Sequence, residues 1–247
     1  MTEMNLKFIS LCCKPNYIAM KNRYFLSAIA FLTTLSGITV SAYSQQQAAP
    51  SFHKGSFRIN LTEGSAHSTY TTNDISSHEV INSMRFIGDR DPLQLEYGLT
   101  GRWGIGLTTG NDIFNNINPT GFYGFQTSTG QVKAKTSELT VDGSYHFFIT
   151  PVSDFSVVGS VGPASVLIQG GTGDMVYQYN AGGGIIRLGL HARCFILRYI
   201  GVVAMVSVYS ENMSPEGVKG NTAGTNYSTS ISGVDIEGGL CFRFSRK

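Results

Sequence analysis

The residues best suited to chemistry are Asp142, Ser144 and His146, which alternate along one predicted strand. Their types match a nucleophilic relay, in which a base takes the proton of a serine hydroxyl and an acid orients the base. Residues two apart on a strand, however, lie in a row on one face, so the base is poorly placed to reach its nucleophile. The His-x-Ser order of membrane deacylases does not occur in the chain. We therefore expect no enzyme activity and no catalytic residue.

Metal, cofactor and nucleic-acid sites are not expected either. The histidines are scattered and lack metal-ligand spacing: His53, His67, His78, His146 and His191. The glycine-rich stretch 101–110 has no Lys-Ser/Thr end and no following helix, so it is not a phosphate loop. Four of the 18 Lys and Arg residues and one of the 16 Asp and Glu residues lie in residues 1–42. The rest of the chain is therefore near neutral. No basic patch predicts binding of nucleic acid.

The N-terminal region predicts export. A basic stretch, Met20–Arg23, precedes the apolar segment Phe25–Val40 and a small-x-small cleavage pattern ending at Ala42. This order is typical of a secretory signal peptide, and the segment is short for a membrane-spanning helix. We assign residues 1–42 to an over-extended start plus signal peptide, and residues 43–55 to a short periplasmic spacer.

The rest of the chain alternates with a period of two, which predicts strands. In the last strand Ile236, Gly238, Leu240, Phe242 and Phe244 share one face, and the charged residues share the other. Charged residues make up only 14% of the chain, against roughly 25% in soluble domains. This pattern suits a strand with lipid on one side and a polar lumen on the other.

Eight such segments follow one another, near residues 57–62, 93–100, 103–108, 138–149, 155–168, 175–190, 195–209 and 230–244. Their connections alternate between long polar segments (67–91, 111–135, 170–174, 211–228) and short turns (100–102, 151–154, 191–193). Outer-membrane barrels show this alternation. The sequence predicts an all-β fold: an eight-stranded antiparallel up-and-down transmembrane β-barrel over residues 56–244.

Two stretches carry a family resemblance. Glu96–Leu107 is similar to the strand-turn-strand of small outer-membrane barrels, and the aromatic end of the last strand resembles the signal that the barrel assembly machinery reads, here Leu240, Phe242 and Phe244. The chain resembles the eight-stranded outer-membrane β-barrel domains related to OmpW, OmpX and OmpA, of the sort common in Bacteroidota. The resemblance implies a Gram-negative outer membrane, contact with its lipid, and surface loops that bind an extracellular ligand.

With the apolar faces toward lipid, the lumen receives a set of charged side chains: Arg58, Glu96, Glu138, Asp142, His146, Arg187, Arg198, Asp235, Glu237 and Arg243. An eight-stranded barrel is just wide enough to be filled by side chains, and buried charges must pair. We expect a salt-bridge network that plugs the barrel. A gated path for ions and a ligand site are the alternatives.

Two further pairs of alternatives stay open at this level. Cys194 and Cys241 are predicted near the same rim, where they are either bridged or free. Aromatic residues such as Trp103 and Phe147 fit an interfacial girdle, although ordinary strand packing would also use them.

The expected function is that of a structural or surface-interaction barrel, porin-like in form. A narrow channel for ions or small solutes is the first alternative. A soluble, lipocalin-like ligand-binding barrel with its apolar face turned inward is the second.

Overall fold

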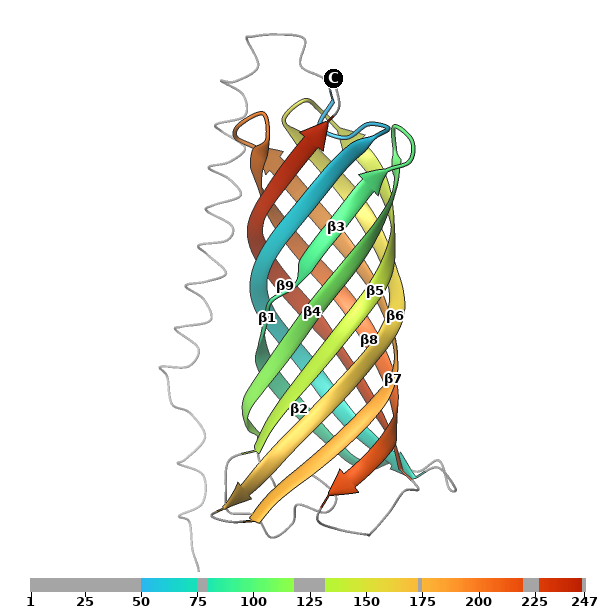
Figure 1. Ribbon diagram of the computed structural model, residues 1–247, viewed down its shortest axis with the longest axis vertical. Coiled ribbons are helices and arrows are strands. Elements are labelled where there is room, and N and C mark those ends of the chain that lie inside the picture. The colour runs from blue at the N-terminus through green and yellow to red at the C-terminus, as the bar shows by residue number, and fades with distance from the viewer. Residues whose placement is uncertain (1–49, 75–79, 118–131, 173–174, 220–226, 246–247) are drawn as a thin grey trace, which may run out of the picture. The chain divides into compact units, whose positions relative to one another are not determined.

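The structure, a computed structural model, describes residues 50–74, 80–117, 132–172, 175–219 and 227–245. These residues form nine antiparallel strands (Figure 1): β1 Ser56–Asp74, β2 Val80–Arg90, β3 Leu93–Gly98, β4 Trp103–Ile117, β5 Val132–Ile149, β6 Ser153–Thr172, β7 Met175–Phe195, β8 Ile200–Lys219 and β9 Tyr227–Ser245. The predicted signal peptide lies outside the described residues. Among those residues, no helix is long and apolar enough to cross a membrane.

β2 and β3 together make one strand of the wall. The hydrogen-bond ladder is interrupted at Pro92, which has no N–H to donate. The register nevertheless continues through the interruption, because Leu61 lies opposite Leu93 and Gly64 lies opposite Arg90. Nine strands therefore occupy eight positions in the barrel.

The eight positions close into a ring. Each of these positions pairs with the next along the chain, and β9 returns to pair with β1 along its whole length, from Ser56 opposite Ser245 to Asp74 opposite Tyr227. Every strand position of the described ring therefore has a partner on both sides, although β2 pairs with β4 only from Gly88 to Arg90. The predicted eight-stranded up-and-down barrel is confirmed.

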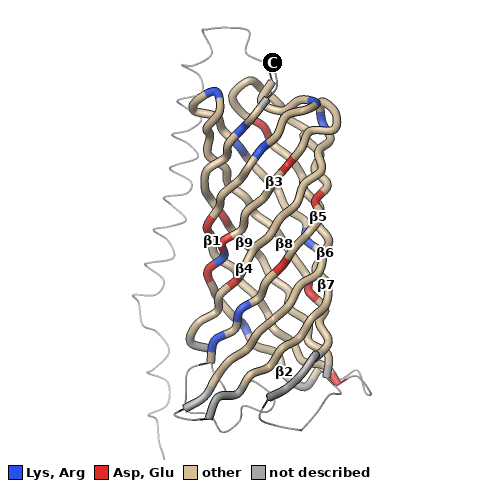
Figure 2. The backbone as a smooth tube through the Cα atoms, in the orientation of Figure 1, with Lys and Arg blue, Asp and Glu red and all other residues tan. Residues whose placement is uncertain are grey.

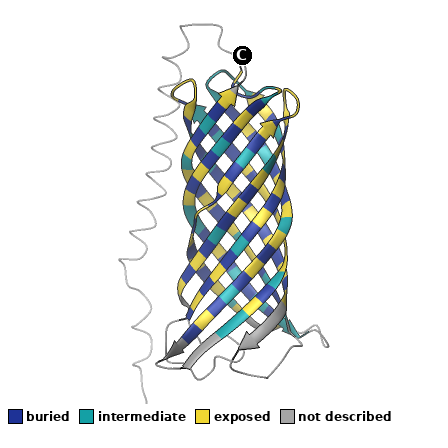
Figure 3. Ribbon diagram, in the orientation of Figure 1, coloured by how far each residue is buried: buried dark blue, intermediate teal, exposed yellow. Residues whose placement is uncertain are grey.

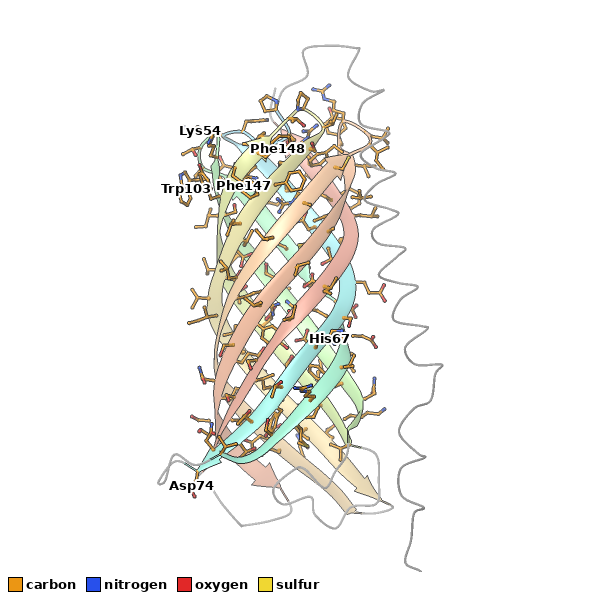
Figure 4. The ribbon with its side chains drawn as sticks, turned by 180° about the vertical axis from the view of Figure 1, so that it is seen from behind. Lys54, His67, Asp74, Trp103, Phe147 and Phe148 are labelled. Carbon is orange, nitrogen blue, oxygen red and sulfur yellow. The ribbon has the colours of Figure 1, made fainter. Side chains whose placement is uncertain are left out.

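Short turns join the strands at one end of the barrel, which we call the turn end. Hydrogen bonds close these turns from Leu99 N–H to Trp103 C=O (2.9 Å), from Thr150 N–H to Ser153 C=O (2.7 Å) and from Ile196 N–H to Ile200 C=O (3.1 Å). The opposite end, which includes Asp74, is the far end (Figures 1 and 4).

Buried and exposed residues alternate along every strand (Figure 3). Nearest the turn end, charged and polar residues point inward and apolar residues point outward. The outward residues form an apolar belt: Phe57, Leu61, Leu93, Ile105, Leu107, Leu139, Val141, Val161, Ile186, Leu188, Leu190, Val206, Val208, Ile236 and Leu240. Along β9 the belt runs from Val234 to Phe244, which for a tilted strand is roughly 25–30 Å.

Toward the far end the two faces exchange polarity. Inside lies an apolar core: Ala66, Tyr70, Phe86, Phe114, Val132, Ala134, Ala164, Val166, Ile168, Ala181, Ile185, Tyr209, Met213 and Ile231. Outside lies a polar sleeve: His67, Arg85, Asp89, Lys133, Lys135, Ser165, Gln169, Ser210, Asn212 and Ser232. The apolar residues Val80, Ile87 and Ile113 are exceptions among the exposed residues of this part.

The strands are much longer than the belt. β6, β7 and β8 have 20, 21 and 20 residues, so a tilted strand spans about 50 Å, roughly twice the height of a lipid-facing band. The extra length is the sleeve and its apolar core.

Several predicted strand ends are wrong. β1 continues to Asp74 and β2 begins at Val80, within the segment 67–91 that was expected to be a long connection. The β7–β8 turn is at 196–199 instead of 191–193. The predictions required apolar residues to face outward, and the strands continue past the point where that rule reverses.

Candidate functional site: the barrel interior

The middle of the lumen holds a central cluster of buried charges: Arg90, Asp112, Glu138, Arg187, Asp235 and Glu237. Arg90 reaches Asp112 at 2.7 Å and Glu237 at 2.7 Å, and it also pairs with Glu138. Arg187 binds the second oxygen of Glu138 at 2.6 Å and also pairs with Asp235 of β9. Two guanidinium groups thus tie together carboxylates from β4, β5 and β9. Figure 2 marks the basic positions along the strands in blue and the acidic positions in red.

A second cluster, the turn-end cluster, comprises Arg58, Glu96, His146, Asp154 and Arg193. Arg58 Nη2 lies 2.5 Å from Asp154 Oδ2, and Arg193 Nη2 lies 3.1 Å from Glu96 Oε2. His146 bridges the two acids, with Nε2 2.9 Å from Glu96 and Nδ1 3.2 Å from Asp154. These residues come from β1, β3, β5, β6 and β7, so the cluster joins five of the eight strand positions.

Asp142 lies between the two clusters and is held by neutral donors. The amide of Gln94 donates to it at 3.0 Å, and the hydroxyls of Thr108 and Thr140 donate at 2.5 and 3.0 Å. Near this layer is a cavity of about 20 Å³, lined in part by Arg90 and Arg187. That volume has room for about one water molecule.

Residues before β1 fold into the turn end of the lumen. Ser51 N–H donates to Thr150 C=O at 2.7 Å, and Arg58 Nη2 donates to Ser51 C=O at 2.6 Å. The Phe52 ring stacks on His146, with centroids 3.6 Å apart and planes 13° from parallel. Phe52 is 1% exposed, so Ser51 and Phe52 form an N-terminal plug over the turn-end cluster. The sequence predicts only a spacer in this region.

Glycine makes room for this packing. A Cβ on Gly104 would lie 2.5 Å from Ser144 Oγ, 3.1 Å from Glu96 Oε1 and 3.3 Å from Phe52. Gly104 therefore faces the plug and the acid it covers, and a larger residue would push both away.

Ser144 and His146 do meet a third residue in relay order. Ser144 Oγ is 3.3 Å from His146 Nε2, and His146 Nδ1 is 3.2 Å from Asp154. The acid is Asp154 and not Asp142, which the row on the strand suggested. Glu96 Oε1, however, accepts from Ser144 at 2.5 Å and lies 2.9 Å from the same His146 nitrogen. A carboxylate thus occupies the position from which a base would take the serine proton.

The predicted lumen residues separate into three groups. Arg58, Glu96 and His146 lie in the turn-end cluster, and Glu138, Arg187, Asp235 and Glu237 lie in the central cluster. Asp142 and Arg243 are buried as well. Arg243 donates to the carbonyl oxygens of Arg198, at 2.8 Å, and Pro151, at 3.4 Å, and its guanidinium lies 4.3 Å from the Phe195 ring.

The placement of Arg198 in the lumen is wrong. It lies in the β7–β8 turn, where it is exposed, and its guanidinium lies 5.2 Å from the Tyr199 ring. The turn had been predicted a few residues earlier, which would have put Arg198 inside a strand.

Of the two alternatives for Cys194 and Cys241, a bridge or free thiols, the structure has both cysteines free. Cys241 is buried inside the barrel. Cys194 alternates with inward-facing Arg193 and Phe195, so it is on the outer side of the wall. Opposite faces of a sheet prevent the bond.

Five buried charges are not among those predicted from the sequence: Arg90, Asp112, Asp154, Arg193 and Glu211. The predicted strands leave these residues in connections and turns. One available signal was that Phe86, Gly88 and Arg90 alternate with Arg85, Ile87 and Asp89, a period of two with mixed polarity on both faces. Within the described residues, no group of three or more His, Cys, Asp or Glu side chains could hold a metal ion.

Comparisons with known proteins give likenesses of structure only. No family model matches the sequence, and no curated protein matches it. The chain is similar to Ail, the attachment invasion locus protein of Yersinia pestis, solved with the heparin analogue sucrose octasulfate (11% identity, TM-score 0.44, 77% of this chain and 99% of that chain). It is similar to the outer membrane protein OprG of Pseudomonas aeruginosa (11%, 0.43, 79% and 98%) and to the outer membrane protease OmpT of Escherichia coli (7%, 0.43, 81% and 99%).

Because these identities and TM-scores are low, the assignment of the barrel rests on the strand pairing and surface of this chain. Eight antiparallel strand positions close into a ring, with an apolar belt outside and buried ion pairs inside. This combination is the architecture of small outer-membrane β-barrels.

Proposed function

We propose that this protein is an exported outer-membrane β-barrel with a closed lumen and no enzyme activity, which holds its far end outside the lipid for contact with other molecules. The observation that carries the proposal is the exchange of polarity along the strands. A belt of exposed Leu, Ile and Val suits lipid, and a polar sleeve around an apolar core suits water. One solvent does not satisfy both parts, so the boundary between them marks one face of the membrane.

The filled lumen supports a structural role over a channel. The N-terminal plug, the two charged clusters and the apolar core follow one another along the axis. The cavity of about 20 Å³ has room for about one water molecule, and a hydrated ion is larger than that. A lipocalin-like barrel is the weaker alternative, because only the sleeve has the polarity of a soluble protein.

The absence of enzyme activity is supported by the surroundings of Ser144. Its hydroxyl already donates a hydrogen bond to Glu96, and the Phe52 ring covers His146. A substrate would have to displace the plug and compete with a buried carboxylate, whose negative charge opposes the oxyanion of an acyl transfer.

Two partners belong to this proposal. β9 turns Leu240, Phe242 and Phe244 outward, and Leu240 and Phe244 are 47% and 49% exposed, as expected of a strand that the barrel assembly machinery recognises. The connections at the far end, which lie outside the described residues, are the expected place for an extracellular ligand.

Membrane fractionation tests the location. The full chain should be extracted only by detergent and should run as a heat-modifiable band on a gel. A water-soluble periplasmic or secreted product would overturn the proposal and favour the lipocalin-like alternative.

Planar-bilayer recording tests the closed lumen. The folded barrel should pass no current, and E138A, which opens the central cluster, should be less stable but still closed by the apolar core. A steady conductance in the unmodified protein that changes in E138A would favour the channel.

A further inference from the structure

The exposed charges of the turn end all have one sign. Among the described residues of this end, the exposed charged side chains are Lys54, before β1, Arg102, in the β3–β4 turn, and Arg198, in the β7–β8 turn. The acids of the turn-end cluster, Glu96 and Asp154, are buried and paired with Arg58 and Arg193. The rim of this end is therefore positively charged, and its three cations lie on separate parts of the ring.

Exposed aromatic residues gather at the same end. The exposed fraction is between 41% and 56% for Tyr97, Trp103, Phe147, Phe148, Phe155, Tyr199 and Phe244. Figure 4 shows Trp103, Phe147 and Phe148 at the same end of the barrel as Lys54. The described aromatic residues of the far half, such as Tyr70, Phe86 and Phe114, point inward. Trp and Tyr concentrate at the boundary between hydrocarbon and headgroups, so these exposed aromatic residues mark the depth of one membrane interface.

Arg102 and Arg198 lie directly beside these exposed aromatic residues. Arg102 precedes Trp103, and its Nη1 donates to Tyr145 Oη at 3.3 Å, while the Tyr145 and Trp103 rings are 4.9 Å apart. Arg198 precedes Tyr199 and lies over its ring. A guanidinium one residue beyond an interfacial aromatic is at the level of the lipid phosphates, to which it can donate two parallel hydrogen bonds.

We propose that the turn end binds anionic phospholipid headgroups through Arg102 and Arg198, with Lys54 as a third cation on the rim. The proposal rests on the membrane location proposed above. A cation beside an anionic lipid surface contributes about a fivefold preference over a neutral lipid, so each arginine should enrich anionic lipid in its own vicinity.

The single tryptophan of the chain, Trp103, is a natural probe beside Arg102. We would fold the full chain into vesicles that mix phosphatidylglycerol with phosphatidylcholine, with bromine on one lipid at a time. At equal fractions, brominated phosphatidylglycerol should quench Trp103 more strongly, corresponding to roughly fivefold enrichment. R102Q should bring the two lipids close to equal, whereas K133Q, on the polar sleeve, should leave the preference unchanged.

A second pair of variants moves the probe. In W103F/Y199W the tryptophan stands beside Arg198, and the preference should then respond to R198Q and not to R102Q. Salt near 1 M, where the screening length is about 3 Å, should weaken the preference in every variant that shows it.

The outcomes separate the two proposals. Equal quenching by both brominated lipids in the unmodified protein would overturn headgroup binding and leave the membrane location intact. Quenching by neither lipid would overturn the membrane location itself. A preference that survives R102Q unchanged would also overturn the assignment to Arg102.

Discussion

Individual arginines hold the interior together because each one serves several carboxylates. Arg90 pairs with acids on β4, β5 and β9, and Arg58 and Arg193 share Asp154. A buried pair is a weak source of net stability, but removing one partner leaves an uncompensated charge. The interior is therefore most sensitive to single replacements that break a pair.

We expect R90M to be among the most damaging single changes. It keeps the apolar stem of the side chain but leaves Asp112 and Glu237 without their cation and Glu138 with Arg187 alone, at a cost of about 3–5 kcal/mol. Urea unfolding in lipid vesicles, followed by Trp103 fluorescence, measures this loss. D89N, one residue away on the exposed outer face, is the matched control and should change stability by less than about 0.5 kcal/mol. Equal effects would contradict the central cluster as described.

A pair of glycines gives a steric prediction. In G104A the new methyl group displaces the Ser144 hydroxyl from Glu96, which should cost about 1–3 kcal/mol because a buried hydrogen bond to a carboxylate is lost. Gly143 is outward and exposed, with open space around it, so G143A should change stability by less than about 0.5 kcal/mol. The same vesicle unfolding assay compares them, and an equal loss in both would point to backbone flexibility as the cause.

Strands near the turn end could be predicted and their continuations could not. From Ile236 to Phe244 the outward residues are apolar or small, so a period of two with lipid on one side identifies the strand and its inward Asp235 and Glu237. From Ser228 to Ser232 the same strand turns serine outward and Ile231 inward. A prediction that turns every apolar face toward lipid ends the strand at this point. It therefore places Arg90 and Asp112 in connections.

The N-terminal plug could not be predicted for a different reason. Ser51 and Phe52 have no periodic neighbours, and their partners Thr150 and His146 are about a hundred residues away in the sequence. Long-range contacts of a non-repeating segment leave no local pattern. Arg193 was missed because its strand continues beyond the expected turn.

The position of the two cysteines on the wall gives a chemical prediction at the level of β7 and β9. Because Cys194 faces outward and Cys241 faces the lumen, the intact mass should not change with reductant. In the folded barrel a maleimide should modify Cys194 before Cys241, and unfolding should make both react. Modification of Cys241 first would mean that the register or the facing of β9 is wrong, and a reductant-dependent mass would mean that a disulfide forms.

At the scale of the whole molecule, the barrel combines two kinds of β-barrel end to end. The belt encloses ion pairs, as in a membrane protein, and the sleeve encloses Phe, Ile and Val, as in a soluble one. The membrane and lipocalin-like interpretations of the sequence were each suited to one part of the same strands.

Spin labels at two depths test this division. With Cys194 changed to serine, L188C places a label on the belt and N212C places one on the sleeve of the neighbouring strand. In vesicles, the label at 188 should relax with oxygen dissolved in lipid, and the label at 212 with a water-soluble nickel complex. Lipid accessibility at both sites would contradict a projecting sleeve.

The contacts of the N-terminal plug also imply an order in which the barrel assembles. Ser51 and Phe52 bind groups supplied by β1, β5 and the β5–β6 turn, so their resting place does not exist until those strands have come together. Ser51 and Phe52, which precede β1 in the sequence, are then among the last residues to reach their final positions. The stacking of Phe52 on His146 would mark the completion of assembly, and a barrel caught before that moment would have its turn end open to water.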